Sequence, residues 1–376
     1  MKIAVLGAGL VGSVIARDLS AEYDVTAFDI DAIALGSLNK RFPKINVVTA
    51  DLKDYNNYKK MLDPFDLVVT AVPGFMGYET LKAVIRCGKS VADISFSPED
   101  VLNLDAEAKA NNCTVITDCG VAPGISNFII GRYNEFMEID AFEIYVGGLP
   151  EIRKKPFEYK APFSPVDVIE EYTRPARFLE NGVIVVKKAM SETELMDFDG
   201  IGTLEAFNTD GLRSLLTTMP HIKNQKEKTL RYPGHAALII ALQQGGFFDK
   251  EEILIRGQKV SPLEVTSKIL FKEWKLDPEE AELTVLKIIL KGKINGKPET
   301  VVYNLLDRYH EESGVSSMSR TTGYTCTATA NIIARGIFKE KGVFAPESVG
   351  KHKESFDYLM QYLDKREIHC KKEAAG

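Results

Sequence analysis

A glycine-rich turn between an apolar run and a helix-like segment constrains the fold of this sequence most. Residues 2–6 have the composition of a buried strand, and residues 11–19 follow with the spacing of a helix. Gly7, Gly9 and Gly12 lie between them at G-x-G-x-x-G spacing. This pattern is typical of dinucleotide binding: the first glycine permits a tight turn, the second lets the backbone approach a pyrophosphate, and the third lets the helix pack closely. We therefore predict a dinucleotide at the helix N-terminus, contacted by Gly7, Ala8, Gly9, Leu10, Val11 and Gly12.

An acidic residue follows this turn at the distance expected for ribose binding. A second apolar run, residues 25–28, ends in Asp29. A carboxylate at this place accepts hydrogen bonds from a ribose 2′-hydroxyl and repels a 2′-phosphate. Ile30 and Asp31 provide no arginine that would offset the repulsion. The sequence therefore predicts NAD rather than NADP.

Strand and helix patterns alternate through the first 130 residues, which predicts a doubly wound, parallel α/β sheet of the Rossmann type. Further strands are expected at residues 46–49, 66–70, 90–94 and 113–117. Ligands of such sheets bind at the carboxyl ends of the strands. We therefore expect the cofactor to contact Asp51, Ala71, Val72, Pro73, Asp93 and Ser95, and the substrate to lie near Asp118, Gly120, Pro123 and Gly124.

Several of these assignments have structural alternatives that the sequence leaves open. Asp51 could reach the adenine side of a cofactor or could cap the helix that begins near Asp54. Residues 71–74 could approach the nicotinamide ribose or form an ordinary Pro-Gly turn. Asp93, Ser95 and Asp118 could each cap a helix or bond a turn instead of facing a substrate.

The pattern changes near Ile139. A strand is expected at residues 140–146, and two hairpins are predicted at residues 177–188 and 284–307, around Asn181-Gly182 and Asn295-Gly296. These features predict a second, α+β domain with a mainly antiparallel sheet. An apolar helix at residues 328–338, with a polar lead-in from Arg320, is expected to return to the first domain. The resulting domains are an NAD-binding domain at 1–125, a substrate-binding and dimerisation domain at 126–320, returning C-terminal helices at 321–365, and a flexible tail at 366–376.

Bulk properties exclude several classes of function. A chain of 376 residues, 45% of them hydrophobic, is long enough for two domains. The net charge of −6 argues against a nucleic-acid surface, and no apolar stretch approaches the roughly 20 residues of a membrane helix. The five cysteines are scattered without a C-x-x-C pair, so we expect free thiols and no metal site. The sequence enters a strand at once without a basic, cleavable leader, and we expect a cytoplasmic protein.

Motifs along nearly the whole chain resemble one known family. They are Gly7-x-Gly9-x-x-Gly12, residues 71–74, 93–96, 120–124 and 145–150, Ser164-Pro165 with 170–177, 205–207 with 210–213, and 229–235. The chain resembles the saccharopine dehydrogenase-like oxidoreductases, and the runs at 170–177 and 230–235 look most like those of the lysine 6-dehydrogenases. The resemblance implies NAD-dependent oxidative deamination of the ε-amine of L-lysine to allysine, which cyclises to piperideine-6-carboxylate, by a homodimer or larger homo-oligomer.

Two other functions compete with this one. The first is a saccharopine or carboxynorspermidine dehydrogenase-type reductase, which acts on a secondary amine and needs cationic contacts for a second carboxylate. The second is a non-catalytic, NAD-binding regulatory protein that has kept the fold.

The chemistry of amine oxidation asks for particular side chains. Hydride can leave only when the amine is neutral, and a free lysine amine has a pKa of about 10.4. A base or an apolar pocket must therefore favour the neutral amine, and the candidate bases are Asp93 and His235. Arg174 and Arg231, with Arg213 behind them, are the candidates for the substrate carboxylate, because guanidinium groups bind carboxylates with two parallel hydrogen bonds.

Each of these assignments also has a structural alternative. The arginines could form salt bridges with nearby acids such as Glu170, Glu171 and Glu205, and His235 could merely act as a cap or line the pocket. Asp210 could hold the substrate α-ammonium or cap the next helix. The remaining candidates for substrate contact are Asn208 and Tyr232.

Overall fold

The computed structural model of the chain describes residues 1–161, 165–277 and 280–373, without the side chains of residues 165 and 166. Ser164 of the family motif and residues 374–376 of the tail therefore lie outside the described residues. The chain divides into two compact units. Unit 1 contains Met1–Ile139, Gly292–Glu299 and Ser319–Cys370, and unit 2 contains Asp140–Lys291, Thr300–Met318 and the residues from Lys371 onward.

Unit 1 is built from alternating strands and helices, with a C-terminal addition. Its strands are β1 (Lys2–Leu6), β2 (Asp24–Asp29), β3 (Asn46–Thr49), β4 (Leu67–Thr70), β5 (Ser90–Asp93), β6 (Thr114–Ile116) and β17 (Gly342–Phe344). Its helices are α1 (Leu10–Leu19), α2 (Ala32–Arg41), η1 (Tyr55–Asn57), α3 (Tyr58–Leu62), α4 (Gly74–Arg86), η2 (Val101–Leu104), α5 (Asp105–Ala110), α6 (Ile125–Tyr133), α11 (Ser317–Ala334), α12 (Pro346–Gly350) and α13 (Lys353–Asp364).

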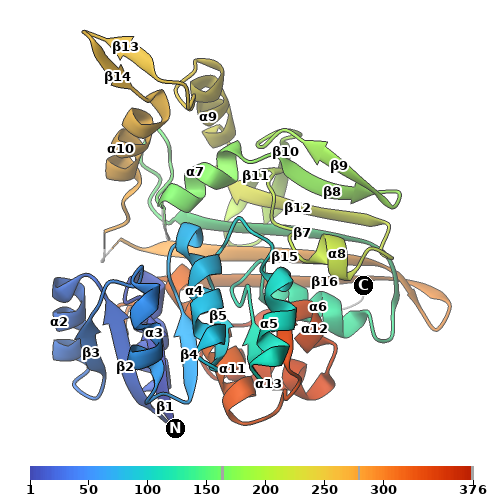
Figure 1. The fold of residues 1–376 in the computed structure, drawn as a ribbon. Coiled ribbons are helices and arrows are strands. Elements are labelled where there is room, and N and C mark those ends of the chain that lie inside the picture. The colour runs from blue at the N-terminus through green and yellow to red at the C-terminus, as the bar shows by residue number, and fades with distance from the viewer. Residues whose placement is uncertain (162–164, 278–279, 374–376) are drawn as a thin grey trace. The chain divides into compact units, whose positions relative to one another are not determined.

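The strands of unit 1 form one parallel sheet in the order β17-β6-β5-β4-β1-β2-β3 (Figure 1). This arrangement confirms the predicted doubly wound sheet. The direction of winding reverses between β1 and β4, so the loops after these two strands flank the switch point. Strand β17 adds a seventh strand that the sequence did not predict, because three residues are too few to show a period.

Helices cover both faces of this sheet. Helices α3, α4 and α5 bury their apolar residues against one face. Helices α1 and α11 lie together on the other, where Gly323 approaches Val14 and the hydroxyl of Tyr23 donates to Asn331 Oδ1 over 2.7 Å. The C-terminal segment therefore returns to unit 1, although α11 begins at Ser317 and already includes the polar lead-in.

The buried threonines of the lead-in form hydrogen bonds within the helix. Thr325 donates to the carbonyl of Thr321 over 2.7 Å, and Thr329 donates to that of Thr325 over 2.9 Å. Each buried hydroxyl is thus satisfied within the helix itself. The helix ends at Ala334, four residues earlier than predicted.

The tail is ordered further than the sequence predicts. The Arg366 guanidinium forms an ion pair with Asp18 at 2.8 Å, and the Tyr362 hydroxyl donates to the same carboxylate. Residues Cys370–Lys372 form β18, which lies beside β16 (Lys297–Arg308). Residues 366–373 therefore differ from the predicted flexible tail, because an ion pair and a strand partner far away in sequence hold them.

Unit 2 contains one large sheet, a small hairpin and several helices. Its strands are β7 (Glu138–Pro150), β8 (Ala176–Glu180), β9 (Val183–Lys187), β10 (Glu194–Phe198), β11 (Gly202–Asn208), β12 (Asn224–Arg231), β13 (Ile253–Ile255), β14 (Gln258–Val260), β15 (Glu282–Ile294) and β16. Its helices are α7 (Pro165–Thr173), α8 (Leu215–Thr218), α9 (His235–Gln244) and α10 (Pro262–Trp274).

The large sheet of unit 2 runs β10-β11-β12-β7-β15-β16-β18, with the hairpin of β8 and β9 attached to β12. Both predicted hairpins are confirmed, and positive φ angles at Asn181 (51°), Gly182 (80°), Asn295 (53°) and Gly296 (76°) match primed turns. The pairing of β12 with β7 is parallel, however, so the sheet is mixed. The long connection between these two strands, which includes helix α7, permits a parallel pairing that adjacent hairpins cannot make.

Two further sequence expectations concern the whole chain. All five cysteines are free, and four of them are buried. Among the residues that the structure describes, no helix is long and apolar enough to cross a membrane.

Candidate functional site

In the glycine-rich turn after β1, two glycines leave no room for a side chain and the third faces open space. Gly7 has a φ of +105°, and a Cβ there would lie 2.4 Å from the carbonyl oxygen of Ala71. A Cβ on Gly12 would lie 2.1 Å from the carbonyl oxygen of Gly7. A Cβ on Gly9 would meet nothing within 4 Å. The turn therefore leaves open space at the N-terminus of α1, where a helix of ten residues presents free amide groups to an anion.

Asp29 lies beside this open space at the end of β2. Its Oδ2 accepts a hydrogen bond from the amide of Ala8 over 2.7 Å, and its Oδ1 accepts one from Asp31 over 3.0 Å. The side chain is half-buried and fixed against the turn. Ile30 and Ile33, which follow it, are 68% and 86% exposed and carry no charge. The residues present fit the adenosine ribose of a dinucleotide.

Asp51 braces its own turn. Its Oδ1 accepts a hydrogen bond from the amide of Lys53 over 2.9 Å, and its carbonyl accepts one from Asp54. The carboxylate does not cap η1, whose N-cap is Asp54. Asp51 is exposed and keeps lone pairs that could receive a ligand.

The loop after β4 lies directly against the phosphate turn. The amide of Ala71 donates to the carbonyl of Leu6 over 2.8 Å, and the carbonyl of Ala71 occupies the space that a side chain on Gly7 would need. Val72 is buried, and Pro73 is the N-cap of α4. Residues 71–73 therefore border the switch point, and their contact with a ligand stays a prediction.

Asp93 is a fully buried carboxylate at the end of β5. Its Oδ1 accepts hydrogen bonds from the hydroxyl of Thr70 over 2.5 Å and from the amide of Ser95 over 3.0 Å. Its Oδ2 is buried and has no hydrogen-bond partner. Burial raises the pKa of Asp93 to about 7. One carboxylate oxygen is thus held in place and the other is left to accept a proton.

The loop after β6 closes over the backbone of Asp93. The amide of Cys119 donates to the Asp93 carbonyl over 2.9 Å, and the amide of Gly120 donates to the Pro123 carbonyl over 3.1 Å. Gly124 has a φ of +137°, and a Cβ there would lie 1.8 Å from the carbonyl oxygen of Gly120. The three predicted substrate-side residues Gly120, Pro123 and Gly124 therefore form one tight turn near Asp93.

A buried pair that the sequence analysis missed braces this turn. Asn127 Oδ1 accepts from the amide of Gly124 over 3.2 Å, and Asn127 Nδ2 donates to Glu347 Oε2 over 2.8 Å. Helices α6 and α12 approach closely here, because Gly131 and Gly350 each face backbone atoms of the other helix. The partners are 220 residues apart, so no local pattern could have revealed the pair.

Unit 2 holds a buried arginine. Arg231 is 3% exposed. Its Nε donates to the Tyr172 hydroxyl over 2.8 Å and its Nη1 to the carbonyl of Leu230 over 2.9 Å. Its Nη2 contacts the Tyr159 hydroxyl and Glu171 Oε2, each at 3.4 Å, and the contact with Glu171 is the ion pair that the structural alternative for Arg231 predicted. The guanidinium is therefore fixed at two nitrogens and loosely held at the third.

His235 supports this arginine through a hydrogen-bonded chain. Its Nδ1 lies 2.9 Å from the carbonyl of Phe157 and must donate, because a carbonyl only accepts. Its Nε2 is then unprotonated and accepts from the Tyr172 hydroxyl over 3.0 Å, while the Tyr172 oxygen accepts from Arg231. Burial and the nearby Arg231 charge lower the pKa of His235 to about 3. The geometry therefore supports a structural role for His235 and disfavours a role as a base.

Tyr172 was missed as a functional candidate, although it lies within the family motif at 170–177. The sequence feature that could have identified Tyr172 is its position between Glu171 and Arg174, which the sequence analysis did name. The same motif supplies Glu171, which also accepts a short hydrogen bond from the hydroxyl of Thr229.

Arg174 and Asp210 are held by partners on unit 2. Arg174 forms an ion pair with Glu170 at 2.7 Å, as its structural alternative predicted. Asp210 accepts two side-chain hydrogen bonds from Arg177, each 2.9 Å long. Asp210 therefore does not cap the next helix, and its carboxylate is already neutralised by a cation.

Tyr232 and Asn208 also have structural contacts. The Tyr232 hydroxyl donates to the carbonyl of Pro150 over 2.9 Å. Asn208 is fully buried, and its Nδ2 donates to the hydroxyl oxygen of Ser191 over 3.1 Å. Its Oδ1 is buried without a hydrogen-bond partner. Asn208 and Tyr232 are therefore both held by other residues of the protein.

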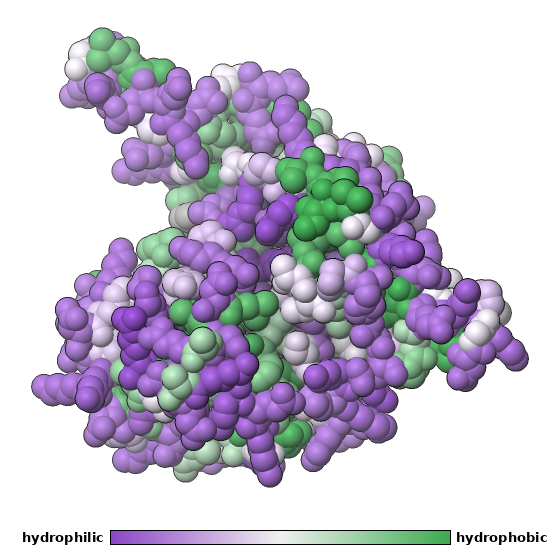
Figure 2. Space-filling view, turned by 45° about the vertical axis from the view of Figure 1, so that its right-hand side comes forward, coloured by the Kyte–Doolittle hydropathy of each residue, from purple (hydrophilic) through white to green (hydrophobic). Residues whose placement is uncertain are grey.

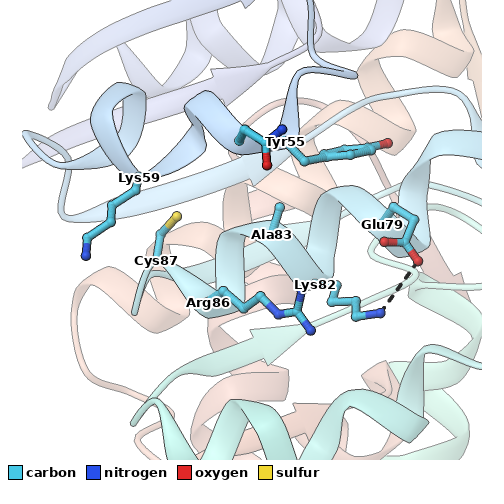
Figure 3. A pocket seen from close by; sticks show the side chains of 8 residues that line it. Tyr55, Lys59, Glu79, Lys82, Ala83, Arg86 and Cys87 are labelled. Carbon is cyan, nitrogen blue, oxygen red and sulfur yellow. Dashed lines mark ion pairs between the residues drawn. The ribbon is translucent and has the colours of Figure 1, made fainter.

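A separate pocket lies on the outer surface of unit 1. It has a volume of about 310 Å³ and is bordered by η1, α3 and α4 (Figure 3). Lys82 forms an ion pair with Glu79 at 3.8 Å, and Arg86 forms one with Glu107 at 2.7 Å. Its α4 residues follow the first turn of that helix, which runs away from the carboxyl edge of the sheet. The pocket is therefore distinct from the residues predicted to bind ligands.

In the described part of the chain, no group of three or more His, Cys, Asp or Glu side chains is placed to hold a metal ion.

Comparisons with known proteins cover both units. The saccharopine dehydrogenase NADP binding domain matches residues 3–116, and the saccharopine dehydrogenase C-terminal domain matches residues 120–368. Carboxyaminopropylagmatine dehydrogenase of Synechocystis sp. is 22% identical, with 93% of this chain and 92% of that protein aligned. The NADP-linked, L-glutamate-forming saccharopine dehydrogenase of Schizosaccharomyces pombe is 24% identical, with 82% and 84% aligned.

Two further matches define the extent of the similarity. The alpha-aminoadipic semialdehyde synthase of Arabidopsis thaliana is 24% identical over 66% of this chain, which spans only 25% of that larger protein. The solved structure of apo saccharopine dehydrogenase from Saccharomyces cerevisiae superposes with a TM-score of 0.81 at 20% identity and covers the whole of both chains. The two chains therefore share a fold.

Substitution of Gly9 tests dinucleotide binding without disturbing the packing of the protein. In Gly9→Ala the new methyl group meets no protein atom, so we expect an unchanged melting temperature and dinucleotide binding weakened about tenfold or more through loss of the close approach. Titration of NADH fluorescence and thermal melting measure the two effects. Gly12→Ala is the matched control, which should lower the melting temperature because its methyl group meets the Gly7 carbonyl; equal melting losses in both variants would contradict this assignment.

The raised pKa of Asp93 predicts a pH-dependent stability. The pKa of Asp93 in the folded protein is about 7, above the ordinary value of 3.8. The contribution of this carboxyl to the free energy of unfolding is therefore fully present below about pH 4, and it is lost as the pH rises to 7. The loss is at most about 1.4 kcal/mol per pH unit for one carboxylate. Asp93→Asn removes the ionising group. Between pH 4 and 7 the free energy of unfolding of the wild type should therefore fall relative to that of the variant. Urea unfolding at several pH values measures it, and parallel profiles would refute it.

Proposed function

The chain belongs to the saccharopine dehydrogenase family, and from this premise we propose that it is an NAD-dependent dehydrogenase that oxidises the ε-amine of L-lysine to allysine. The product would cyclise to piperideine-6-carboxylate. The observation that carries the proposal is the buried Asp93 carboxylate, which lies at the carboxyl end of β5 with one unpartnered oxygen and a pKa raised to about 7. Such perturbed carboxyls at a ligand-binding edge are typical of catalytic acids and bases.

Asp93 suits the proton transfer that amine oxidation requires. A lysine ammonium must lose a proton before its nitrogen lone pair can form the imine, and a base is most effective when its pKa lies near the working pH. Thr70 and Ser95 hold one carboxylate oxygen, which directs the other to receive the proton. The nicotinamide of a bound cofactor would take the hydride from the substrate carbon.

The cofactor would be held by unit 1. Gly9 leaves room for the pyrophosphate at the N-terminus of α1, and Asp29 is fixed beside it for the ribose hydroxyls. The loop at residues 71–73 borders the same edge. Asp29 and the uncharged Ile30 and Ile33 favour NAD, whereas the matching domain and the fungal relative are named for NADP.

Arg231 suits the amino-acid end of the substrate. Its loosely held Nη2 could exchange two contacts of 3.4 Å for a charge-assisted bond to a carboxylate. The guanidinium lies 4.5 Å from the centre of the Tyr159 ring, which shields its charge from water. Tyr172 and His235 would fix its orientation rather than take part in proton transfer.

A second candidate function is a dehydrogenase that forms or cleaves a secondary amine. The relatives named carboxyaminopropylagmatine dehydrogenase and saccharopine dehydrogenase favour it, since both align over most of this chain. The proton transfer assigned to Asp93 would serve this reaction equally. A non-catalytic NAD-binding protein is the third possibility, and the buried base and arginine argue against it.

An amine panel tests the reaction. With NAD, we expect L-lysine to generate NADH absorbance that increases from neutral to alkaline pH, and cadaverine to react at least tenfold more slowly because it lacks the carboxylate for Arg231. Asp93→Asn should abolish most of the rate, while the exposed Asp63→Asn control should not. Turnover of saccharopine without turnover of lysine would select the second candidate, and NAD binding without turnover of any amine would select the third.

A charge-matched pair of variants tests the cofactor. Asp29→Ala should reduce the ratio of kcat/KM for NAD to that for NADP by about tenfold or more, because a charged hydrogen bond of roughly 1.5–3 kcal/mol to the ribose is lost along with the repulsion of a 2′-phosphate. Asp24→Ala removes a carboxylate from the other end of β2 and should leave the ratio unchanged. An unaltered ratio in both variants would remove Asp29 from the cofactor site.

A further inference from the structure

Strand β9 is an apolar strand at an edge of the unit 2 sheet. In the described part of the chain it pairs with β8 alone. Val183, Ile184 and Val186 are 64%, 53% and 66% exposed. Edge strands of monomeric proteins are normally protected by charges, prolines or bulges, because their unpaired backbone groups invite another strand. The run Val-Ile-Val-Val-Lys has no proline and only one charge.

The hairpin fixes which backbone groups of β9 face outward. In a two-residue hairpin the residues that flank the turn, here Glu180 and Val183, form a hydrogen-bonded pair. Bonded pairs alternate along an antiparallel ladder, so Val185 is bonded to β8 and Ile184 is not. The N–H and C=O groups of Ile184 and Val186 therefore point away from β8, toward a missing neighbour.

Lys187, the single charged residue of β9, forms ion pairs within its own chain. Lys187 Nζ lies 2.5 Å from Glu180 Oε1 and 2.8 Å from Glu192 Oε1. Its side chain is 21% exposed. Two copies of this edge can therefore approach without repulsion between their lysines.

The exposed apolar surface continues beyond β9. Strand β10 ends the order of the large sheet, and its Leu195 is 65% exposed. Both edges lie on the same side of β12, since β8 pairs at Gln225 and β11 pairs at Lys228–Arg231. Figure 2 shows hydrophobic side chains gathered on this part of unit 2.

We propose that β9 is the contact by which a second copy of this chain binds, through antiparallel pairing of the two β9 strands about a two-fold axis at Val185. In this register Ile184 faces Val186 of the partner subunit, and both outward pairs form backbone hydrogen bonds. If the pairing register shifted by two residues, Val186 would face the turn of the partner subunit, or Ile184 would face the residue that follows its strand. The contact is self-complementary, as a two-fold dimer requires, and joins the two sheets into one.

Cysteine cross-linking tests the register. At the two-fold axis, Val185 faces its own copy in a non-hydrogen-bonded pair, whose Cα atoms lie about 4.5 Å apart. This distance is within the range of a disulfide. Val185→Cys should therefore form a covalent dimer on oxidation, seen by non-reducing electrophoresis against the oxidised wild type. Val183→Cys, the matched control, faces Lys187 of the partner subunit and should not; equal cross-linking of both variants, or none, overturns the register.

Solution mass tests the surface independently of the register. Light scattering should show a dimer for the wild type and a monomer for Val186→Lys, with unchanged circular dichroism. Leu254→Lys, in the 73% exposed position of the separate hairpin β13–β14, should remain a dimer. A monomeric wild type, a dimeric Val186→Lys, or loss of the dimer only in Leu254→Lys would overturn the proposal.

Discussion

The close approach of two backbone segments at the switch point is the constraint on which unit 1 depends. The turn at Gly7 lies against the carbonyl of Ala71, and Gly12 lies against the carbonyl of Gly7, so no side chain can be accommodated at either glycine. This packing brings the ends of β1 and β4 together and leaves the space at Gly9 open. Asp29 is held against the same turn by its hydrogen bond from the amide of Ala8.

Both units bury an ionisable group, and they stabilise it differently. Arg231 is surrounded by oxygen acceptors and aromatic faces, which keep it charged. Asp93 has partners for one oxygen only, so burial raises its pKa toward neutrality. A fixed cation suits recognition of a carboxylate, whereas a carboxylate that titrates near pH 7 suits proton transfer. The proposed division of labour between Arg231 and Asp93 follows from this difference.

Several elements could be predicted because their information is local. Asn181-Gly182 and Asn295-Gly296 specify primed turns wherever they occur between strands, and both hairpins formed as expected. The parallel partner of β7, the three-residue β17 and the ordered residues 366–373 could not be predicted, since each depends on a partner distant in sequence. The same applies to His235, whose environment comes from Phe157 and Tyr172.

The sequence by itself determined the dinucleotide-binding turn, the alternation of strands and helices, and the residue types available for hydride and proton chemistry. Glycine spacing and hydrophobic period act within a few residues, and they need no knowledge of the rest of the chain. Only the tertiary structure decided which polar groups are satisfied and which are not. It neutralised Asp210 with Arg177 and left Asp93 Oδ2 unpaired. Burial and hydrogen bonding, which set a pKa, exist only once distant segments have packed.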